Sequence, residues 1–589
     1  MREFAQRISA NPPGVCPVDM SLAFLKVCHA QTCGKCAPCR IGLGILEELL
    51  ESVLDGKATE ETLELIEHTA ENIKNSADCA IGFESARMVL AGLEGFREDY
   101  LSHVRNHTCI GSFEQPIPCV TLCPANVDIP GYIALAGQGR CEDAVRLIRK
   151  DNPFPTACAL ICEHPCEKRC RRSMIDDAIN IRGMKRYAVD KAKNVPVPAN
   201  APSTGKRVAI IGGGPSGLTA AYFLQLMGHQ TTVFEEKKQL GGMLRYGIPN
   251  YRFPRERLQE DIDAILSTGV EVKLNTPVDQ ELLEQLNRDY DAIYAAIGAH
   301  TDKKLGLEGE DSKNVISAVE LLREIGDDVY PDFSGKRVIV VGGGNVAMDC
   351  ARTAVRSKAE TVSIVYRRRQ EDMTALPAEV EGAIAEGVEL LTLKAPLRIE
   401  ANEAGEAAAL WVQPQMIGPV RGGRPAPKKA AKPEERLECD LVIVAIGQDI
   451  VAEPFEKAGI ATRRNSLLAD EAGNLNRVGM FAGGDCVTGP ATVIKAIAAG
   501  KVAAANIDEF LGYHHTISVD VEIPEPLLND KTPCGRVNQA EMESWARKKT
   551  FEGLEYCMSD EEAKQEASRC LRCDRHGCGV LRGGRQDRW

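Results

Sequence analysis

The hydrophobic pattern changes character along this chain. Two segments near the N-terminus, GLGILEELLESVLDG and TEETLELIEHTAENIKNS, place apolar residues three and four positions apart, which predicts amphipathic helices. Thr59 is expected to cap the second of these helices. Farther along, short apolar runs at Val208–Ile211, Thr231–Phe234 and Val338–Val341 indicate buried parallel strands. The pattern therefore predicts a helical N-terminal part followed by an α/β part.

The first strand opens a dinucleotide-binding fingerprint. Gly212, Gly214 and Gly217 follow it in G-x-G-x-x-G spacing, an apolar helix runs to about Met227, and a second strand ends at Glu235. The first glycine allows a tight turn, the second lets the backbone approach a pyrophosphate, and the helix N-terminus faces the phosphates. The acidic residue suits ribose hydroxyl groups. A glycine-rich turn without a ligand is the alternative, and the complete strand–helix–strand context disfavours it.

The fingerprint is repeated in the second half of the chain. Gly342, Gly344 and Ala347 follow another apolar strand, and each copy is followed by a matching strand, DAIYAAIG or DLVIVAIG. Two such units imply two nucleotides held face to face. The stretch GPVRGGRPAPKKAAKPEERLE in the second unit indicates a hairpin tip or surface loop, to which we assign no function.

The two copies differ where the ribose of the nucleotide is expected. Val365 stands in the second copy at the place of Glu235, and Tyr366, Arg367, Arg368 and Arg369 follow it. Guanidinium groups match a 2′-phosphate bidentately, which predicts NADPH rather than NADH, and Tyr366 could cover the adenine. A solvated basic turn is the alternative.

Composition and charge narrow the function classes. At 589 residues the chain should hold about three to five domains of ~150 residues. A net charge of -13 argues against a nucleic-acid or acidic-membrane partner. The N-terminal MREFAQRISANPPG lacks an apolar signal region, and no run reaches ~18 apolar residues, so we expect a cytoplasmic protein.

Cysteine is the unusual component, with 22 residues in the chain, and in a cytosolic protein this indicates metal or redox chemistry more often than disulfides. Cys33, Cys36 and Cys39 form C-x2-C-x2-C, and Cys79 lies downstream. Three thiolates on one loop with a distant fourth suit a [4Fe-4S] cluster, whereas zinc prefers C-x2-C pairs. We treat Cys16 and Cys28 as packing thiols, and structural zinc remains the alternative to the cluster.

The segment CGKCAPCR with the later CAIG resembles the iron–sulfur domain of the NADH-binding flavoprotein subunit of respiratory complex I and of NAD-reducing hydrogenases. The FMN-binding part of that subunit is absent here. The resemblance, over residues 1–104, therefore implies an electron-conducting module and no second NADH site.

The segment PANVDIPGYIALAGQGRCEDAVRLIRKDNPFP, within residues 105–195, resembles the helical N-terminal domain of the glutamate synthase small subunit and of dihydropyrimidine dehydrogenase. That domain binds two [4Fe-4S] clusters. The resemblance implies that Cys123 joins Cys162 and Cys166, and that Cys119 joins Cys170.

Two departures from that family affect the expected ligands. The opening C-x2-C pair is missing, and only Cys109 stands near its place. Lys185 replaces a Gln or Glu ligand, and Cys158 could substitute for it. The first cluster is thus expected on Cys123, Cys158, Cys162 and Cys166, and the second on Cys109, Cys119, Cys170 and an unknown fourth ligand. Alternatively, the cysteines at 158, 162, 166 and 170 could share one helix face, although Pro165 should break that helix.

The segment GGMLRYGIPNYRFP resembles the FAD domain of the glutamate synthase small subunit, in a likeness that extends over about 105–510. In that family the second unit is inserted into the first, which implies an FAD domain at 206–310 and 450–512, an NADPH domain at 311–449, and, by remainder, a tail at 513–589. The expected FAD contacts are Gly212, Gly214, Pro215, Ser216, Gly217, Glu235, Gly241, Gly242, Met243, Leu244, Arg245, Gly298, Gly484, Asp485, Thr492 and Val493. The expected NADPH contacts are Gly342, Gly344, Asn345, Val346, Ala347, Tyr366, Arg367 and Arg368.

The tail carries a further cysteine group. Cys570, Cys573 and Cys578 form C-x2-C-x4-C, with Cys557 or Cys534 as a possible fourth ligand. A further cluster, zinc and free thiols remain open, so the chain is expected to hold two to four [4Fe-4S] clusters.

These features predict an α/β flavoprotein with two Rossmann-type domains behind two helical iron–sulfur domains. FAD converts hydride transfer into single-electron transfer, and no protein acid or base is needed, so we name no catalytic residue. Disulfide reduction is rejected because Cys350, Cys439 and Cys486 are solitary.

We expect a subunit of a cytosolic multi-subunit oxidoreductase with a partner resembling the NADH/FMN subunits of hydrogenase-type complexes. The combination suggests an electron-bifurcating transhydrogenase or hydrogenase-type complex linking NADPH, NAD and ferredoxin. The alternatives are a glutamate synthase small subunit and a non-catalytic, electron-conducting scaffold.

Overall fold

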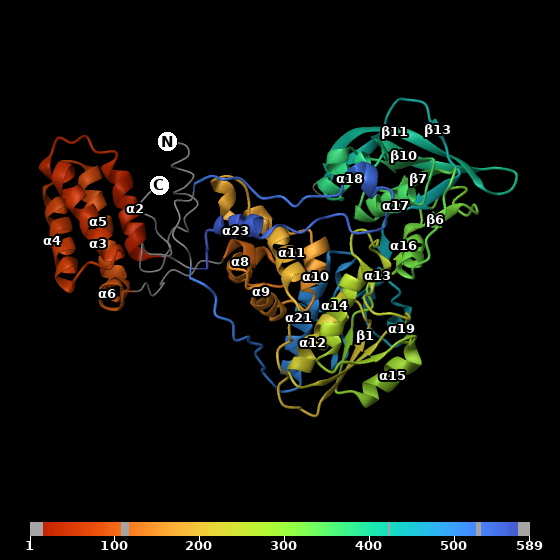
Figure 1. Cartoon of the computed structure of the whole chain (residues 1–589), viewed down its shortest axis with the longest axis horizontal. Helices are drawn as coiled ribbons and strands as arrows, with labels where there is room; N and C mark the ends of the chain where they lie inside the picture. The colour runs from red at the N-terminus through yellow and green to blue at the C-terminus, as the bar shows by residue number, and fades with distance from the viewer. Residues whose placement is uncertain (1–15, 108–116, 422–423, 526–531, 575–589) are drawn as a thin grey trace.

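The computed structural model describes residues 16–107, 117–421, 424–525 and 532–574. Figure 1 shows a helical N-terminal domain at one end of an elongated molecule, with a second helical domain in the middle and two α/β domains at the far end. Among the described residues, no helix combines the length and the apolar character that crossing a bilayer requires.

The N-terminal domain (residues 16–107) has a core of its own. Leu22, Leu46, Ile66 and Val89 from successive helices are buried together. Thr59 caps α4 through a reciprocal capping box with Thr62, as expected. The elements are α2 (Pro17–His29), the π-helix η1 (Pro38–Gly42), α3 (Leu43–Leu54), α4 (Glu60–Ser76), α5 (Ala80–Gly95) and α6 (Arg97–Asn106).

The cysteine-rich domain (residues 117–195) is built from short helices. They are α7 (Pro118–Leu122), α8 (Ile129–Gly137), α9 (Cys141–Arg149), α10 (Pro155–Ile161), η2 (Pro165–Arg169), η3 (Arg171–Met174) and α11 (Ile181–Lys191). Because α10 ends at Ile161, the four cysteines from 158 to 170 do not share one helix face.

The first nucleotide-binding domain is a parallel sheet in the order β18-β4-β1-β2-β3. Val208 of β1 pairs with Thr231 of β2 and with Ala292 of β4. The strands are β1 (Arg207–Ile211), β2 (Gln230–Phe234), β3 (Glu271–Lys273), β4 (Ala292–Ala295) and β18 (Met480–Ala482). The helices are α12 (Pro215–Leu226), α13 (Met243–Tyr246), α14 (Arg255–Leu266), α15 (Gln280–Asp289), α19 (Glu453–Lys457), α20 (Asp485–Thr488) and α21 (Val493–Phe510).

The second nucleotide-binding domain repeats this architecture with the order β6-β14-β7-β8-β9. The strands are β6 (Val315–Ser317), β7 (Arg337–Val341), β8 (Thr361–Tyr366), β9 (Glu389–Thr392) and β14 (Leu441–Val444). The helices are α16 (Ala318–Gly326), α17 (Asn345–Arg356), η4 (Gln370–Asp372) and α18 (Pro377–Ala385). An antiparallel sheet of β10 (Lys394–Ala401), β11 (Ala407–Arg421), β12 (Arg424–Lys429) and β13 (Glu435–Glu438) is added to it.

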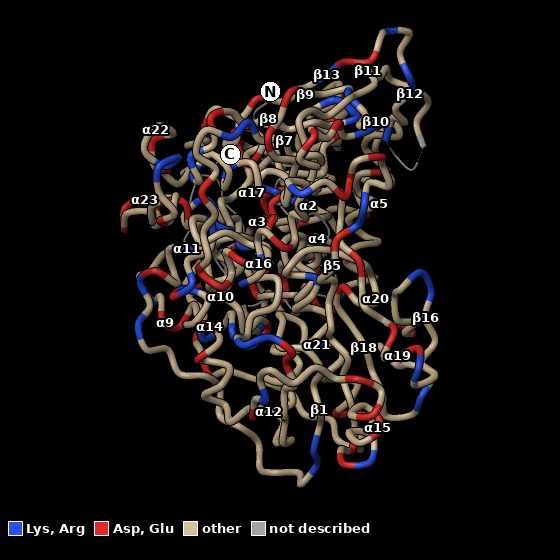
Figure 2. The backbone as a smooth tube through the Cα atoms, turned by 90° about the vertical axis from the view of Figure 1, so that its right-hand side faces the viewer, with Lys and Arg blue, Asp and Glu red and all other residues tan. Residues whose placement is uncertain are grey.

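The chain crosses between the two α/β domains twice. Both crossings run together, because β5 (Thr301–Asp302) pairs antiparallel with β15 (Gln448–Asp449). A small hairpin of β16 (Thr462–Arg463) and β17 (Ser466–Leu467) follows the return. Figure 2 shows β7 and β8 above β1 and β18, with the β11–β12 hairpin projecting at the top right and with basic and acidic residues interspersed.

The described part of the tail (residues 511–525 and 532–574) carries two short helices, α22 (Ser544–Arg547) and α23 (Asp560–Ser568). It contacts the second nucleotide-binding domain, where Arg547 pairs with the buried Glu386 at 3.0 Å. It then reaches the cysteine-rich domain, where α23 packs on α8 (Figure 1).

Candidate cofactor sites

The glycine loop before α12 leaves room for a ligand. A Cβ on Gly217 would lie 2.0 Å from the carbonyl oxygen of Gly212, so this glycine is required by helix–strand packing. A Cβ on Gly214 would meet nothing closer than Gly242 Cα at 3.7 Å. Gly214 also begins α12 without a side-chain cap, so the helix N-terminus is open to a pyrophosphate.

The second glycine loop has the same design. Gly342 has a φ of +154°, and a Cβ there would lie 2.3 Å from the carbonyl oxygen of Ala445. A Cβ on Gly344 would meet its nearest atom, Thr374 Oγ1, at 3.4 Å, and Gly344 begins α17 without a side-chain cap. Ala347 is fully buried behind the loop. Both loops therefore fit a dinucleotide phosphate.

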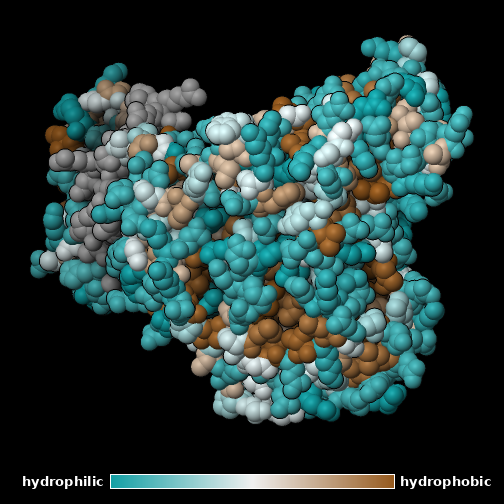
Figure 3. All heavy atoms as spheres, turned by 45° about the vertical axis from the view of Figure 1, so that its right-hand side comes forward, coloured by the Kyte–Doolittle hydropathy of each residue, from teal (hydrophilic) through white to brown (hydrophobic). Residues whose placement is uncertain are grey.

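A cavity at the carboxyl edge of the first sheet suits the adenosine half of FAD. Its lining includes Gly212, Gly214, Glu235, His300 and Phe455. The carboxylate of Glu235 accepts hydrogen bonds from Gly213 N at 2.7 Å and Lys237 N at 2.8 Å. Burial raises the pKa of Glu235. Its position beside the loop agrees with the expected ribose contact. Figure 3 shows hydrophobic residues exposed in the lower half of the molecule, where this domain lies.

A second cavity lies where three domains meet. The first nucleotide-binding domain contributes Pro215, Met243, Leu244, Asp485, Thr492 and Val493. The second contributes Asn345 and Val346, and the cysteine-rich domain contributes Ile161 and Glu163. Helix α21 begins at Val493 with no side-chain cap on Thr492, so its positive end borders the cavity. Burial raises the pKa of Asp485 to about 6. The cavity suits an isoalloxazine ring.

Some predicted flavin residues lie behind this cavity. Arg245 is buried, and its carbonyl oxygen faces α16, where a Cβ on Gly326 would lie 2.9 Å from it. The hydroxyl of Ser216 hydrogen-bonds to that of Tyr294 at 2.7 Å. The remaining glycines have positive φ angles: Gly241 (+118°), Gly242 (+52°), Gly298 (+66°) and Gly484 (+77°). They shape the walls of the site through backbone conformation.

A third cavity follows the second glycine loop. Its lining includes Gly342, Gly344, Asn345, Arg367 and Arg368. Arg367 is exposed, whereas the Nε of Arg368 donates to the carbonyl oxygen of Pro425 at 3.2 Å. Two cations therefore stand where a 2′-phosphate is expected.

Tyr366 and Arg369, on either side of these two arginines, contact the chain around the second glycine loop. Tyr366 lies beneath Gly343, and its hydroxyl donates to the carbonyl oxygen of Asp372 at 2.9 Å. Its ring thus packs under the glycine loop and also lines the third cavity, and its contact with the adenine stays a prediction. Arg369 forms an ion pair with Asp372 at 2.9 Å.

Sequence reasoning missed Arg424. This residue pairs with Arg421 at the start of β12, in the hairpin to which we had assigned no function, and it lines the third cavity. The only available signal was the basic composition of RGGRPAPKK. The structure adds a third cation to the nucleotide cavity.

The flavin and nucleotide cavities have walls in common. Asn345, Val346 and Gln448 line both. Asn345 Nδ2 also donates to Glu163 Oε1 at 2.9 Å, beside Cys162. One side chain thus borders the nicotinamide approach, the flavin cavity and the cysteine-rich domain.

The N-terminal domain brings its four predicted ligands together. Cys39 lies on η1, and the thiols of Cys36, Cys79 and Cys33 are close enough to affect its pKa. Burial raises the pKa of Cys39 to about 12, and the backbone N–H of Asp78 lowers the pKa of Cys36. Cys16, by contrast, lies 3.5 Å from His103 Nε2 in the core. Four convergent thiols fit a [4Fe-4S] cluster.

A second group surrounds the buried Lys185. The thiols of Cys158, Cys162, Cys123 and Cys166 lie close enough to the Lys185 ammonium group to affect its pKa. A hydrogen bond from Cys158 lowers the pKa of Cys162 to about 6. Burial opposes the charged form of Lys185, but the surrounding thiols raise its pKa. This group matches the expected first cluster of the domain, with a cation beside it.

The remaining cysteines are distributed differently from the expectation. Cys119 and Cys170 lie beside Cys570 and Cys573 of the tail. Cys557 lies instead near Cys141 and Asp190, and Cys534 lies near Arg172, which itself lines the cavity of the tail pair. Cys109 and Cys578 lie outside the described residues. Cys350, Cys439 and Cys486 are buried, and no described cysteine lines the flavin cavity.

Family models match three parts of the chain. Residues 206–500 match the family described as Pyridine nucleotide-disulphide oxidoreductase. Residues 19–103 match the NADH-ubiquinone oxidoreductase-F iron-sulfur binding region. Residues 102–196 match dihydropyrimidine dehydrogenase domain II, 4Fe-4S cluster.

Three curated relatives are similar over most of their length. The beta subunit of the NADPH-Fe(3+) oxidoreductase of Geobacter sulfurreducens is 35% identical over 94% of this chain and 90% of that protein. The beta subunit of the NADP(+)-dependent formate dehydrogenase of Moorella thermoacetica is 33% identical over 95% and 91%. The small chain of the Escherichia coli glutamate synthase [NADPH] is 34% identical over 67% and 88%.

The glycine loops, the cavities and the thiol groups described above fit FAD, NADPH and [4Fe-4S] clusters, and the family matches agree with each of them. The chain belongs to the pyridine nucleotide-disulphide oxidoreductase family, within its glutamate-synthase-small-subunit-like branch of iron–sulfur flavoproteins.

Proposed function

We propose that this chain is the FAD and iron–sulfur subunit of a multi-subunit oxidoreductase that exchanges hydride with NADPH and single electrons with partner clusters. The observation that carries the proposal is the flavin cavity, which has walls from three domains. Asn345 comes from the second nucleotide-binding domain, Asp485 from the first, and Glu163 from the cysteine-rich domain next to Cys162. Such a cavity would bring the nicotinamide approach and the cysteine-rich domain to one flavin.

The residues of the chain hold and orient the reactants. When bound, FAD supplies the conversion between hydride transfer and single-electron transfer to [4Fe-4S] clusters. Gly214 and Gly344 admit the two pyrophosphates, and Arg367 and Arg368 favour the 2′-phosphate of NADPH. The N-terminus of α21 favours negative charge at the ring. Positioning accounts for the chemistry, and no acid or base is assigned.

The N-terminal domain supports a specific kind of partner. Its match to the NADH-ubiquinone oxidoreductase-F iron–sulfur region supports docking to a subunit that resembles the NADH/FMN subunits of hydrogenase-type complexes. The beta-subunit names of two relatives support assembly into a complex. We further propose that the complex bifurcates electrons: two NADPH would reduce one NAD⁺ and two ferredoxins, with the release of one proton. A cytoplasmic location accompanies this proposal.

An anaerobic titration with NADPH tests the core of the proposal. We expect the visible flavin band to bleach and the clusters to give signals of reduced iron–sulfur centres. Flavin that stays oxidised with excess NADPH would instead support the non-catalytic scaffold. For bifurcation, ferredoxin reduction by NADPH in the purified complex should require NAD⁺, and reduction without NAD⁺ contradicts it.

Identification of the partner subunit distinguishes this proposal from a glutamate synthase small subunit. We expect affinity-purified chain to retain subunits that resemble the NADH/FMN proteins. Recovery of a large glutamate-forming subunit instead would favour the alternative. The extent of the similarity argues against that outcome. Two relatives match 94% and 95% of this chain, and both are beta subunits of other oxidoreductases. The glutamate synthase small chain matches 67%.

A further inference from the structure

Two segments that lie far apart in the sequence meet at one cavity in the cysteine-rich domain. The thiols of Cys570, Cys573 and Cys170 are electrostatic neighbours of Cys119. All four cysteines line the same cavity, together with apolar side chains that include Ile129 and Ile181. The described residues thus form a four-thiol group that the sequence had divided between two incomplete sets.

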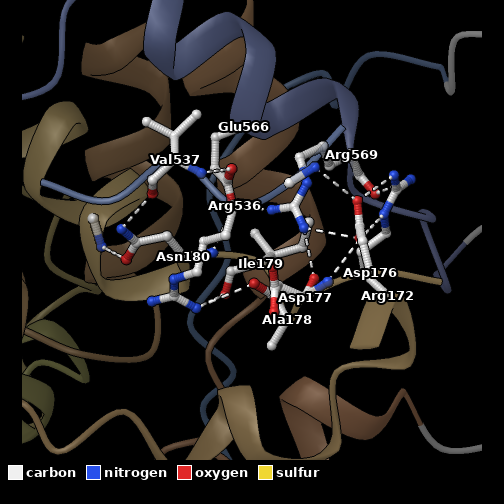
Figure 4. Close-up of polar contacts among 12 residues, drawn as sticks. Arg172, Asp176, Asp177, Ala178, Ile179, Asn180, Arg536, Val537, Glu566 and Arg569 are labelled. Atoms are coloured by element: carbon white, nitrogen blue, oxygen red, sulfur yellow. Dashed lines mark hydrogen bonds and ion pairs between the residues drawn. The ribbon is translucent and has the colours of Figure 1, made fainter. Parts of the chain in front are cut away.

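The tail is held at this place by buried ion pairs. Arg569, which precedes Cys570, pairs with Asp176 at 3.0 Å and with Glu566 at 2.6 Å (Figure 4). Glu566 accepts hydrogen bonds from the backbone N–H of Asn180 at 2.7 Å and of Val537 at 2.9 Å. The side chains of Arg569 and Glu566 are fully buried. Buried charges cost free energy unless they are paired, so the ion pairs of Arg569 favour this position of the tail.

The contacts also fix the register of the two cysteine segments. Arg172, two residues after Cys170, donates from Nη1 to the carbonyl oxygen of Arg569 at 3.4 Å. Asp176 accepts from the backbone N–H of Gly535 at 3.1 Å. Helix α23 lies so close to α8 that a Cβ on Gly137 would be 2.4 Å from Ala567 Cβ. The C-x2-C pair is therefore built into the fold.

We propose that Cys119, Cys170, Cys570 and Cys573 are the ligands of one [4Fe-4S] cluster, and that the tail supplies the C-x2-C pair that is missing before Cys119. Four cysteine thiolates are the usual ligand set of such a cluster. The choice of a cluster over zinc rests on the electron transfer of the proposed function, whereas the test measures iron and zinc without turnover.

The neighbouring site favours a cluster over structural zinc, which four thiolates can also bind. Helix α7 carries Cys119 toward this group, and Cys123 follows the helix in the group around Lys185. Cys166 of that second group is also an electrostatic neighbour of Cys119. Two adjacent clusters form a path for single electrons, whereas zinc carries none.

The test uses the full-length chain purified anaerobically, with iron, zinc and FAD measured per chain. The wild type should hold about twelve irons, in three clusters of four, and no stoichiometric zinc. Replacing Cys570 and Cys573 together by Ala should remove about four irons and one cluster signal in low-temperature EPR, with FAD retained. Cys119→Ala should remove the same signal.

The combination of the two changes gives the sharpest outcome. If the four thiols hold one cluster, the triple variant at 119, 570 and 573 loses about four irons in total. Loss of about eight irons would place Cys119 in one cluster and the Cys570/Cys573 pair in another, and would overturn the proposal. About eight irons and one zinc in the wild type, which needs no variant to fold, would also overturn it. Cys557→Ala is the matched tail control and should leave the iron content unchanged.

Discussion

Asn345 and Glu163 connect the second nucleotide-binding domain to the cysteine-rich domain, because Asn345 Nδ2 donates to Glu163 Oε1 at 2.9 Å. Both side chains line the flavin cavity, and Glu163 follows Cys162 directly in the chain. The bond therefore holds the nicotinamide side of the cavity against its iron–sulfur side.

Glu163→Ala should slow the reduction of the flavin by NADPH by about ten-fold. A hydrogen bond to a charged group contributes roughly 1.5–3 kcal/mol, and its loss leaves the two walls less well aligned. Anaerobic stopped-flow measurement of the flavin band gives the rate. Glu163→Gln keeps an acceptor for the Asn345 amide and should stay near the wild-type rate. An unchanged rate in Glu163→Ala, with iron and FAD intact, would contradict the role of this bond.

The cations of the third cavity should control nucleotide choice. Arg367→Ala and Arg368→Ala, made separately, should each weaken NADPH binding by about ten-fold or more and leave NADH binding almost unchanged, since each charge-assisted bond contributes roughly 1.5–3 kcal/mol. Arg424→Ala should act in the same direction. Anaerobic titration with both nucleotides measures the affinities.

The neighbouring Arg369 is the control for those variants. It is paired with Asp372 at 2.9 Å and should leave both affinities near those of the wild type when changed to Ala. The assignment is wrong if NADPH and NADH lose affinity equally, or if the wild type prefers NADH.

Substitutions of Gly214 and Gly344 should affect the binding of FAD and of NADPH separately. Gly214→Val should give protein without FAD, because the side chain would occupy the space that a pyrophosphate needs and that the fold itself leaves free. Gly344→Val should keep FAD and lose NADPH binding. Released flavin is measured after denaturation. Stoichiometric FAD in Gly214→Val would refute the fingerprint interpretation.

Iron in the N-terminal domain should depend on its four convergent thiols. Cys36→Ala should remove about four irons per chain, and Cys28→Ala, outside the group, should remove none. Loss of one zinc with unchanged iron in Cys36→Ala would show that the site holds zinc.

Lys185 should raise the reduction potential of the cluster whose ligands surround it. At an effective dielectric constant of about 20, a unit charge at about 5 Å changes the free energy of adding an electron by roughly 3 kcal/mol, on the order of 0.1 V. Lys185→Met should therefore lower that potential, while the potential of the N-terminal cluster serves as an internal control. A redox titration followed by EPR measures both, and an unchanged potential would contradict the prediction.

The parts that could be predicted from the sequence are those with local signals. The glycine spacing around Gly212 and Gly342 predicted both Rossmann units, and C-x2-C-x2-C with Cys79 predicted a site that the structure brings together. Fold class and cofactors were confirmed by the family matches. Local spacing sufficed because these residues lie within one loop or one strand–helix junction.

The missed features depend on tertiary placement. Arg424 reaches the nucleotide cavity from an added hairpin, and Glu163 reaches the flavin cavity from another domain. The whole α/β part lies in the sequence between the thiols of the tail and those of Cys119 and Cys170. Neither periodicity nor spacing carries information about such encounters, since the partners share no segment.

The return of the tail has a consequence for biosynthesis. The hydrogen bond between Arg172 and Arg569 joins residues 397 positions apart, so a ribosome must make both nucleotide-binding domains before the last two thiols of the proposed site emerge. Until then Cys119 and Cys170 can offer a nascent cluster only half of its ligands. We expect iron loading of this site to follow translation of the α/β part, so the finished cluster marks a chain that has been synthesised at least to Cys573.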